Sequence, residues 1–318
     1  MSRYRHELPQ LSGKAFATDG GLETTLIHHE GIDLPHFAAF DLLKSAAGTE
    51  VLRAYYARYA RIARALQRGF VLEAPTWRAN ADWAAKLGYD ARSLADVNRT
   101  AIGLMLELRA AHASAECRMV VSGNIGPRGD GYRADARMSI DGARAYHSAQ
   151  IDTFAGTDAD MVAAFTMNYV EEAVGVARAA QAAAMPVVIS FTLETDGRLP
   201  SGDTLADAIR RTDDATDRAP IYYMINCAHP THFERVLASA GEHDNWRARI
   251  RGLRANASRR SHAELDASSD LDAGDPESLG AEHRALGALL PGLAVVGGCC
   301  GTDHRHVDAI CRALNHCA

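Results

Sequence analysis

Three of the six cysteines lie in segments whose composition suits a shared metal site. Cys227 follows an asparagine in the segment 225–230, and Cys299 and Cys300 are adjacent in the glycine-rich segment 297–302. Zinc prefers tetrahedral coordination by sulfur and nitrogen, and three protein ligands with one open position are typical of catalytic zinc. From spacing alone, ordinary burial of small apolar thiols remains an open alternative, because a long stretch of chain separates Cys227 from the pair.

A zinc site with three thiolate ligands would favour chemistry on a substrate thiol. An alkyl thiol is mostly protonated at neutral pH, and only its thiolate is a good nucleophile. Coordination to zinc removes the thiol proton and keeps the sulfur reactive. We therefore expect a substrate sulfur to take the open position and to attack an electrophilic methyl group.

The backbone must bend for two adjacent cysteines to reach one ion, because successive side chains of an extended chain point in opposite directions. Gly297, Gly298 and Gly301 flank the pair, and glycine adopts conformations that are closed to other residues. The sequence therefore predicts a sharply bent segment whose shape depends on these glycines.

Short apolar runs alternate along the chain with longer segments of helical periodicity. Strands are predicted at 15–18, 70–73, 119–122, 161–166, 187–192, 221–226, 250–255 and 294–296. Helices are predicted at 50–67, 94–115, 143–154, 171–184, 205–214, 231–239, 279–290 and 304–314. This alternation indicates an α/β protein with a single (β/α)8 TIM barrel domain over residues 1–318, and an open doubly wound sheet is the alternative.

Three polar or sulfur-containing segments follow predicted strands one, six and eight. They are 18–23, 225–230 and 297–302. The strands of a barrel end on one rim, and that rim carries the active site. The irregular segment 256–280 follows strand seven, so we expect it on the same rim, either as a substrate lid or as a passive surface loop.

Composition and charge narrow the class of protein. The 318 residues are 47% hydrophobic and 23% charged, and the net charge is −6. This acidic balance argues against binding of nucleic acid, which needs a basic excess. We find no signal peptide and no apolar run near the roughly 20 residues that span a bilayer, so we expect a cytoplasmic protein without a membrane segment. The chain also lacks the glycine-rich phosphate loop, the dinucleotide fingerprint, the serine elbow and the His-Glu-x-x-His motif.

Cysteine usage fits the same compartment. Six cysteines in an intracellular chain of this length indicate metal binding, catalysis or burial, and no disulfide is expected. We predict that Cys117, Cys311 and Cys317 are buried as small apolar side chains.

Several motifs in order resemble the homocysteine S-methyltransferase family over nearly the whole chain, from about residue 15. They are Asp19-Gly20-Gly21, Gly123-Asn124-Ile125-Gly126-Pro127, Ser190-Phe191 with 197–202, Asn226-Cys227 and Gly297-Gly298-Cys299-Cys300-Gly301-Thr302. The resemblance implies a zinc-dependent barrel that methylates homocysteine to methionine. The implied partners are a small-molecule thiol acceptor and a donor such as S-methylmethionine, S-adenosylmethionine or betaine. The oligomeric state remains open.

The resemblance also implies roles for individual residues. Cys227, Cys299 and Cys300 match the family's zinc ligands. The substrate-binding positions that it implies are Asp19, Gly20, Glu23, Thr76, Phe165 and Asn226. Glu23 is equally well explained as a capping or surface carboxylate, because carboxylates favour the first turn of a helix. Glu73 lies in the segment with Thr76, and this segment is only loosely similar to the family's.

Two positions depart from the family pattern. Many members carry a glutamate after strand four that contacts the homocysteine amino group, and this chain has Phe165 there. A phenyl ring attracts an ammonium only weakly, so Asn168 or Glu194 is expected to substitute, or the acceptor is another thiol. After strand seven the family segment is replaced by 256–264, in which we expect His262 to be a solvated loop residue.

Two other classes of function stay open on the sequence. A zinc hydrolase would hold water at the open position, although three thiolates leave zinc a weaker acid than histidine ligands do. A zinc-binding structural or sensor protein would fill the fourth position, for example with His229. A site without a fourth protein ligand would favour catalysis.

Overall fold

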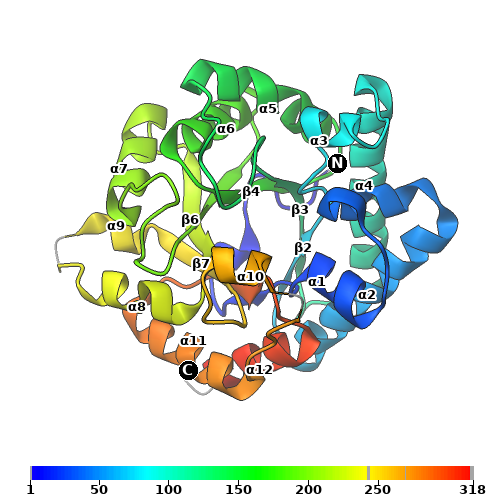
Figure 1. Ribbon diagram of the computed structural model, residues 1–318. Coiled ribbons are helices and arrows are strands. Elements are labelled where there is room, and N and C mark those ends of the chain that lie inside the picture. The colour runs from blue at the N-terminus through cyan, green and yellow to red at the C-terminus, as the bar shows by residue number, and fades with distance from the viewer. Residues whose placement is uncertain (1, 242–243, 269, 316–318) are drawn as a thin grey trace.

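Eight parallel strands close into a barrel in the computed structural model, which describes residues 2–241, 244–268 and 270–315. The strands pair in chain order, and β1 pairs with β8 to complete the ring (Figure 1). They are β1 Phe16–Ala17, β2 Phe70–Glu73, β3 Met119–Ile125, β4 Met161–Met167, β5 Val187–Thr192, β6 Pro220–Asn226, β7 Ile250–Ala255 and β8 Val295–Gly298. The predicted barrel is confirmed, and the open sheet is excluded.

The long helices surround the barrel, as predicted (Figure 1). They are α2 Ala46–Ala65, α4 Ala91–His112, α5 Ile140–Ala155, α6 Val170–Ala182, α7 Leu205–Thr216, α8 Pro230–Ala238, α11 Pro276–Leu289 and α12 His304–Asn315. Four short helices were not predicted, because three to five residues show no periodicity. They are α1 Leu22–Thr24, α3 Ala81–Ala85, α9 Asn245–Ala248 and α10 His262–Asp266. Among the described residues, no helix has the length and apolar character needed to cross a membrane.

Side-chain caps explain why several helices begin before their predicted starts. The side chains of Asp90, Ser139 and Asp275 each accept a hydrogen bond from a backbone N–H in the first turn. Such a cap satisfies a donor that the helix itself leaves free. Helices α4, α5 and α11 therefore begin at residues 91, 140 and 276 and not at 94, 143 and 279.

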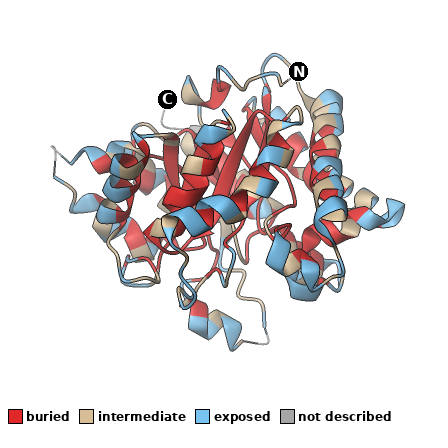
Figure 2. Cartoon of the chain, turned by 90° about the horizontal axis from the view of Figure 1, so that it is seen from above, coloured by how far each residue is buried: buried red, intermediate tan, exposed pale blue. Residues whose placement is uncertain are grey.

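The strands carry apolar side chains on both faces, as expected for a parallel sheet that is covered by helices. On β2, Phe70 and Leu72 pack toward the helices, while Val71 belongs to the cluster inside the barrel. Figure 2 shows buried strands at the centre and helices whose outer faces are exposed. By the same alternation Glu73 points into the barrel.

The N-terminal segment packs against the apolar cluster inside the barrel. Leu8 and Leu11 join this cluster, and the Gln10 amide contacts the sulfur of Met161 at 3.3 Å. The backbone N–H groups of residues 3 and 4 donate to the buried Asp160 carboxylate at 2.8 and 2.7 Å. These contacts cover the end of the barrel from which β4 starts and lie away from the rim of the predicted site.

Candidate active site

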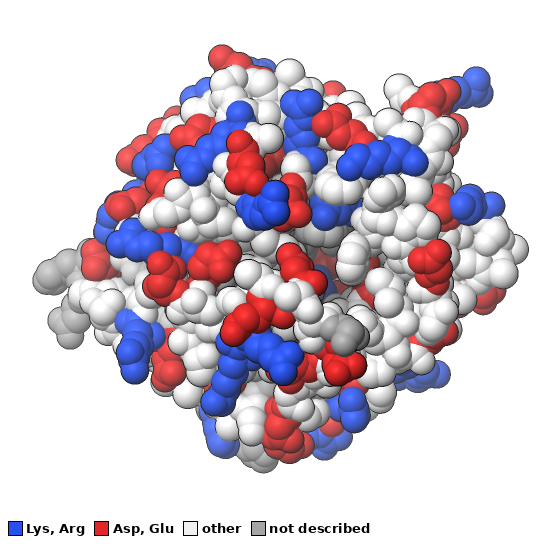
Figure 3. Space-filling model, viewed as in Figure 1, with Lys and Arg blue, Asp and Glu red and all other residues white. Residues whose placement is uncertain are grey.

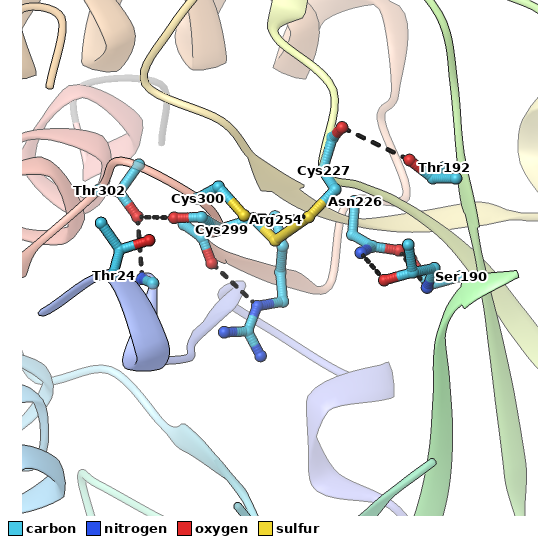
Figure 4. The surroundings of a disulfide bond; sticks show 12 residues. Thr24, Ser190, Thr192, Asn226, Cys227, Arg254, Cys299, Cys300 and Thr302 are labelled. Carbon is cyan, nitrogen blue, oxygen red and sulfur yellow. Dashed lines mark hydrogen bonds between the residues drawn. A yellow bond between two sulfur atoms is a disulfide. The ribbon is translucent and has the colours of Figure 1, made fainter. Parts of the chain in front are cut away.

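The three predicted cysteine ligands meet at the carboxyl ends of β6 and β8. Cys227 follows the last residue of β6, and Cys299 and Cys300 follow the last residue of β8. Backbone bonds join both segments to β7, since the N–H of Cys227 donates to Arg254 and that of Cys299 to Ala255. The three Sγ atoms lie within 4.8 Å of one another (Figure 4).

The glycines beside the cysteines are needed mainly because neighbouring atoms lie too close for a side chain. The conformational freedom of glycine, which we predicted as the reason, matters less. Of the three predicted glycines, Gly301 alone has a positive φ, at 78°. A Cβ at Gly298 would clash with the Thr302 side chain, and one at Gly297 would lie 2.7 Å from the backbone oxygen of Asp19. The left-handed conformation that turns the chain occurs instead at Cys227, with φ of 52°. Such a conformation is uncommon for a residue with a side chain and is often found at functional sites.

Cys227 and Cys299 are joined by a disulfide, which corrects the prediction that the chain has none (Figure 4). The Cys300 Sγ lies 3.7 Å from that of Cys227 and belongs to a free thiol. Burial raises the pKa of the Cys300 thiol. The sequence could not show this bond, because it depends on two sulfurs from separate strands lying within bonding distance. Zinc requires both sulfurs as thiolates, so the disulfide and a three-thiolate zinc site exclude each other.

Metal binding is therefore expected to depend on reduction of this disulfide. After treatment with a phosphine reductant, about one equivalent of zinc will bind per chain, as measured by elemental analysis of the desalted protein. Protein kept oxidised will bind much less, and re-reduction will restore the binding. Equal zinc content in both samples would show that the metal sits elsewhere.

Tyr132 and His262 cover the cysteine cluster from two different loops. The Tyr132 hydroxyl lies 3.4 Å from the Sγ of Cys227 and 3.6 Å from that of Cys300. The Tyr132 ring packs on the imidazole of His262, with centroids 4.2 Å apart. His262 contacts the backbone oxygen of Cys227 at 2.5 Å through Nε2 and the Glu194 carboxylate at 3.1 Å through Nδ1. Side chains from two loops therefore contact the segments that carry Cys227 and Cys300, in addition to the backbone bonds to β7.

His262 is therefore not the solvated loop residue that we predicted. It is only 8% exposed, because α10 folds the loop after β7 back over the barrel. Sequence reasoning did not consider Tyr132 at all. Its place in the irregular loop after β3 was the one signal available, and its partners come from distant parts of the chain.

A cavity of about 640 Å³ opens beside the cysteines. Of the predicted residues, Asp19, Gly20, Glu23, Phe165 and Asn226 line it, together with all three cysteines. The segment 256–280 also lines it, through Asn256, Ser258, His262, Leu265, Asp266, Ser268, Asp270, Leu271 and Asp272. On the face that carries α10, Figure 3 shows acidic and basic side chains mixed around a central hollow.

Thr76 does not line this cavity. It is fully buried, and its hydroxyl donates to the backbone oxygen of Asn124 at 2.7 Å. Its neighbours Pro75 and Trp77 line the cavity instead. The contacts of Thr76 thus join the ends of β2 and β3, and its hydroxyl is not part of the cavity lining.

The Asn226 side chain forms hydrogen bonds to residues of β4 and β5. Its Oδ1 accepts from the Thr166 N–H at 2.9 Å and from the Ser190 hydroxyl at 2.6 Å, and its Nδ2 donates to the Thr166 hydroxyl. Thr166 has a left-handed φ of 63°, which these bonds stabilise. The same turn fixes Phe165 against the cavity, where the Arg254 guanidinium lies 5.1 Å from the ring centroid.

Asp19 forms a buried ion pair with Arg254. Its Oδ1 lies 2.9 Å from Arg254 Nη2, and its Oδ2 accepts from the Tyr55 hydroxyl at 3.0 Å. Arg254 also donates to the backbone oxygens of Gly20 and Gly298, each at 3.0 Å. This arginine, which sequence reasoning did not single out, connects the ends of β1, β7 and β8 beneath the cysteines.

Two further carboxyl groups, of Glu23 and Glu73, face the cavity, and neither forms an ion pair with a described residue. Burial, together with the nearby Asp19 charge, raises the pKa of Glu23 to about 7. Burial also raises the pKa of Glu73 to about 7, against the opposing effect of Arg254. Asn168 and Glu194, our expected substitutes for the family glutamate, lie outside the cavity lining.

No fourth ligand completes the cysteine cluster within the described residues. The potential metal ligands that converge there are Cys227, Cys299 and Cys300 alone. The side chain of His229 instead caps α8 through Thr231 and lies 3.2 Å from Glu282. Burial lowers the pKa of His229 to about 4. Cys117 and Cys311 are buried free thiols, as predicted, whereas Cys317 is outside the described residues.

The sequence and the fold were compared with those of known proteins. The model of a family described as homocysteine S-methyltransferase matches residues 17–314. Among solved structures, the oxidized form of the homocysteine methyltransferase MmuM from Escherichia coli is 18% identical, with a TM-score of 0.74 over 97% of this chain and 99% of that one. The metallated form of that enzyme is also 18% identical, with a TM-score of 0.70 over 94% and 96% of the two chains. No curated protein matches the sequence.

Proposed function

The chain belongs to the homocysteine S-methyltransferase family, and we propose that it transfers a methyl group from a sulfonium or betaine-type donor to the thiol of homocysteine or a close analogue. The product is methionine or a related thioether. The observation that carries this proposal is the convergence of three cysteine sulfurs on a cavity at the carboxyl-end mouth of the barrel.

The sulfur set fits zinc. Tetrahedral zinc with sulfur bonds of about 2.3 Å places its ligands roughly 3.8 Å apart, and the free Cys300 Sγ lies 3.7 Å from that of Cys227. After reduction of the disulfide, Cys227, Cys299 and Cys300 would hold the ion. Bound there, zinc lowers the pKa of a substrate thiol so that it reacts as a thiolate.

The remaining residues orient and enclose the reactants. The Asp19–Arg254 ion pair connects the ends of β1, β7 and β8 below the cysteines. Tyr132 and His262 cover the cysteines. Methyl transfer forms the acceptor sulfur–carbon bond as the donor bond to the same carbon breaks, and the bonding electrons leave with the donor heteroatom. Much of the acceleration then comes from alignment of the two reactants in the enclosed cavity. No side-chain base is needed, because the acceptor has already lost its proton.

A panel of thiols and methyl donors tests the proposal. Reduced, zinc-loaded protein is incubated with each pair, and the products are identified by mass spectrometry. We expect a thioether from homocysteine with at least one sulfonium or betaine donor. Absence of any thioether from every pair, with zinc shown to be bound, would refute the proposed function.

A further inference from the structure

Glu73 presents a buried carboxyl group whose hydrogen bonding within the described residues is incomplete. It is the last residue of β2, is only 2% exposed and lines the cavity beside the cysteines. Its Oε2 makes no hydrogen bond of good geometry, although the Ser122 hydroxyl on the paired strand β3 lies near enough to oppose the rise in the pKa of Glu73. A buried acceptor that is not fully hydrogen-bonded is costly in a protein interior, so a donor group of a bound ligand would stabilise it.

The surrounding charges leave Glu73 available for a cation. Two buried arginines line the cavity, and both are engaged. Arg254 is in contact with Asp19 and two backbone oxygens. Arg78 donates to the backbone oxygen of Gly129 and lies against the rings of Trp77 and Trp83, 4.0 and 3.8 Å from their centroids. Asp19, Glu23 and Glu73 together therefore give the wall formed by the ends of β1 and β2 an excess of acid.

We propose that Glu73 binds the ammonium group of an amino-acid thiol acceptor whose sulfur binds at the cysteine cluster. This inference rests on the proposed function, because the acceptor named by the family carries a thiol and an ammonium on one short chain. The two groups must then find partners in the same cavity. The cysteines serve the sulfur, and Glu73 supplies the negative charge and the hydrogen-bond acceptor for the nitrogen.

Other groups near the cavity are already in use. Asp19 is bonded to Arg254 and Tyr55. The Phe165 ring has the Arg254 guanidinium on it, which leaves little attraction for a second cation. Outside the cavity lining, the Asn168 amide donates to the backbone of Asp130, and Glu194 contacts His262.

The chemistry of the unpaired oxygen favours the acceptor over the reacting centre of the donor. An ammonium has N–H groups to donate. A sulfonium or quaternary ammonium centre has none, so it would leave the Glu73 oxygen unpaired. Glu23 also faces the cavity from α1, but neither of its oxygens is a fully buried atom without a hydrogen-bond partner.

The variant Glu73→Gln keeps the size of the side chain and removes its charge. Calorimetry on reduced, zinc-loaded protein will measure the affinity for homocysteine and for its deaminated analogue, 4-mercaptobutanoate. We expect Glu73→Gln to bind homocysteine about 10- to 100-fold more weakly, as for loss of a hydrogen bond to a charged group. Binding of 4-mercaptobutanoate should change by about threefold or less, since this ligand has no ammonium.

Glu234→Gln, at an exposed position on α8, is the matched control and should leave the affinity for both thiols unchanged. Glu23→Gln tests the other glutamate of the cavity. A selective loss in Glu23→Gln but not in Glu73→Gln would overturn the proposal, as would a change confined to the donor KM. Zinc content and Tm are measured on all three variants. If Glu73→Gln does not fold, the wild type decides, because equal affinity for the two thiols would exclude an ammonium site.

Failure of this inference is distinguishable from failure of the proposed function. Wild-type protein that methylates thiols but does not discriminate between these two ligands retains the function and loses the Glu73 site. Wild-type protein that forms no thioether with any pair loses the function itself.

Discussion

Cys227→Ala will lose both zinc binding and methyl transfer. The substitution removes one of three sulfur ligands, and the two that remain, Cys299 and Cys300, come from a single segment. Loss of a residue that merely orients a ligand already costs about 10- to 100-fold in metal affinity, so loss of a ligand should cost more than about 100-fold. Zinc content by elemental analysis and thioether formation by mass spectrometry, both on reduced protein, measure the effect.

The chain offers a matched control for this experiment. Cys117 is a buried free thiol on the segment that leads into β3, away from the cavity lining. Cys117→Ala should keep full zinc content and activity, because it removes a sulfur of the same kind from the core alone. If Cys227→Ala retained both properties, the assignment of the three ligands would be refuted. If Cys117→Ala lost them as well, the assay would be reporting misfolding.

The sequence predicted the barrel because its signals are local. Apolar runs such as 187–192 alternate with helical segments, and each element can be recognised within its own residues. The convergence of the cysteines then followed from the fold, since all strands of a barrel end on one rim. The segment after β8 could be placed near Cys227 for this reason, without knowledge of any contact.

Contacts between loops could not be predicted from the sequence. Four of the eight strands, β4 to β7, separate Tyr132 from His262 along the chain, yet their rings pack together over the cysteines. His262 was assigned to solvent because loops are usually exposed, whereas it is the buried first residue of α10 and contacts Cys227 and Glu194. The disulfide between Cys227 and Cys299 was missed for a related reason. The distance between the ends of two strands cannot be predicted from the residues of either strand.

The position of the negative charge in the cavity also could not be predicted from the sequence. The family resemblance assigned residue 165 to the acceptor site, and Phe165 lines the cavity in the structure. Glu73, two strands away, was seen in the sequence as part of a loosely similar segment. Its importance depends on what surrounds it, since its incomplete hydrogen bonding and the contact of Arg254 with Asp19 are visible only in three dimensions.

Arg254→Ala will destabilise the protein strongly. It leaves the buried Asp19 carboxylate without its counter-charge and two backbone oxygens, of Gly20 and Gly298, without a donor. Breaking a buried ion pair by removing one partner costs about 3–5 kcal/mol. With an unfolding entropy of about 2.1 cal/mol/K per residue, a chain of this length should lose roughly 4–7 °C in Tm. Calorimetric or spectroscopic melting measures the change.

Two further variants separate the ion pair from other losses. Arg99 forms an exposed pair with Asp96 on α4, so Arg99→Ala should change the free energy of unfolding by about 0.5 kcal/mol or less. Adding Asp19→Asn to Arg254→Ala should recover part of the loss, because a neutral amide needs no counter-charge in the core. If the double variant is no more stable than Arg254→Ala, the backbone bonds to Gly20 and Gly298 are the larger contribution. A Tm for Arg254→Ala equal to that of the wild type would contradict the role of this ion pair in holding β1, β7 and β8 together beneath the cysteines.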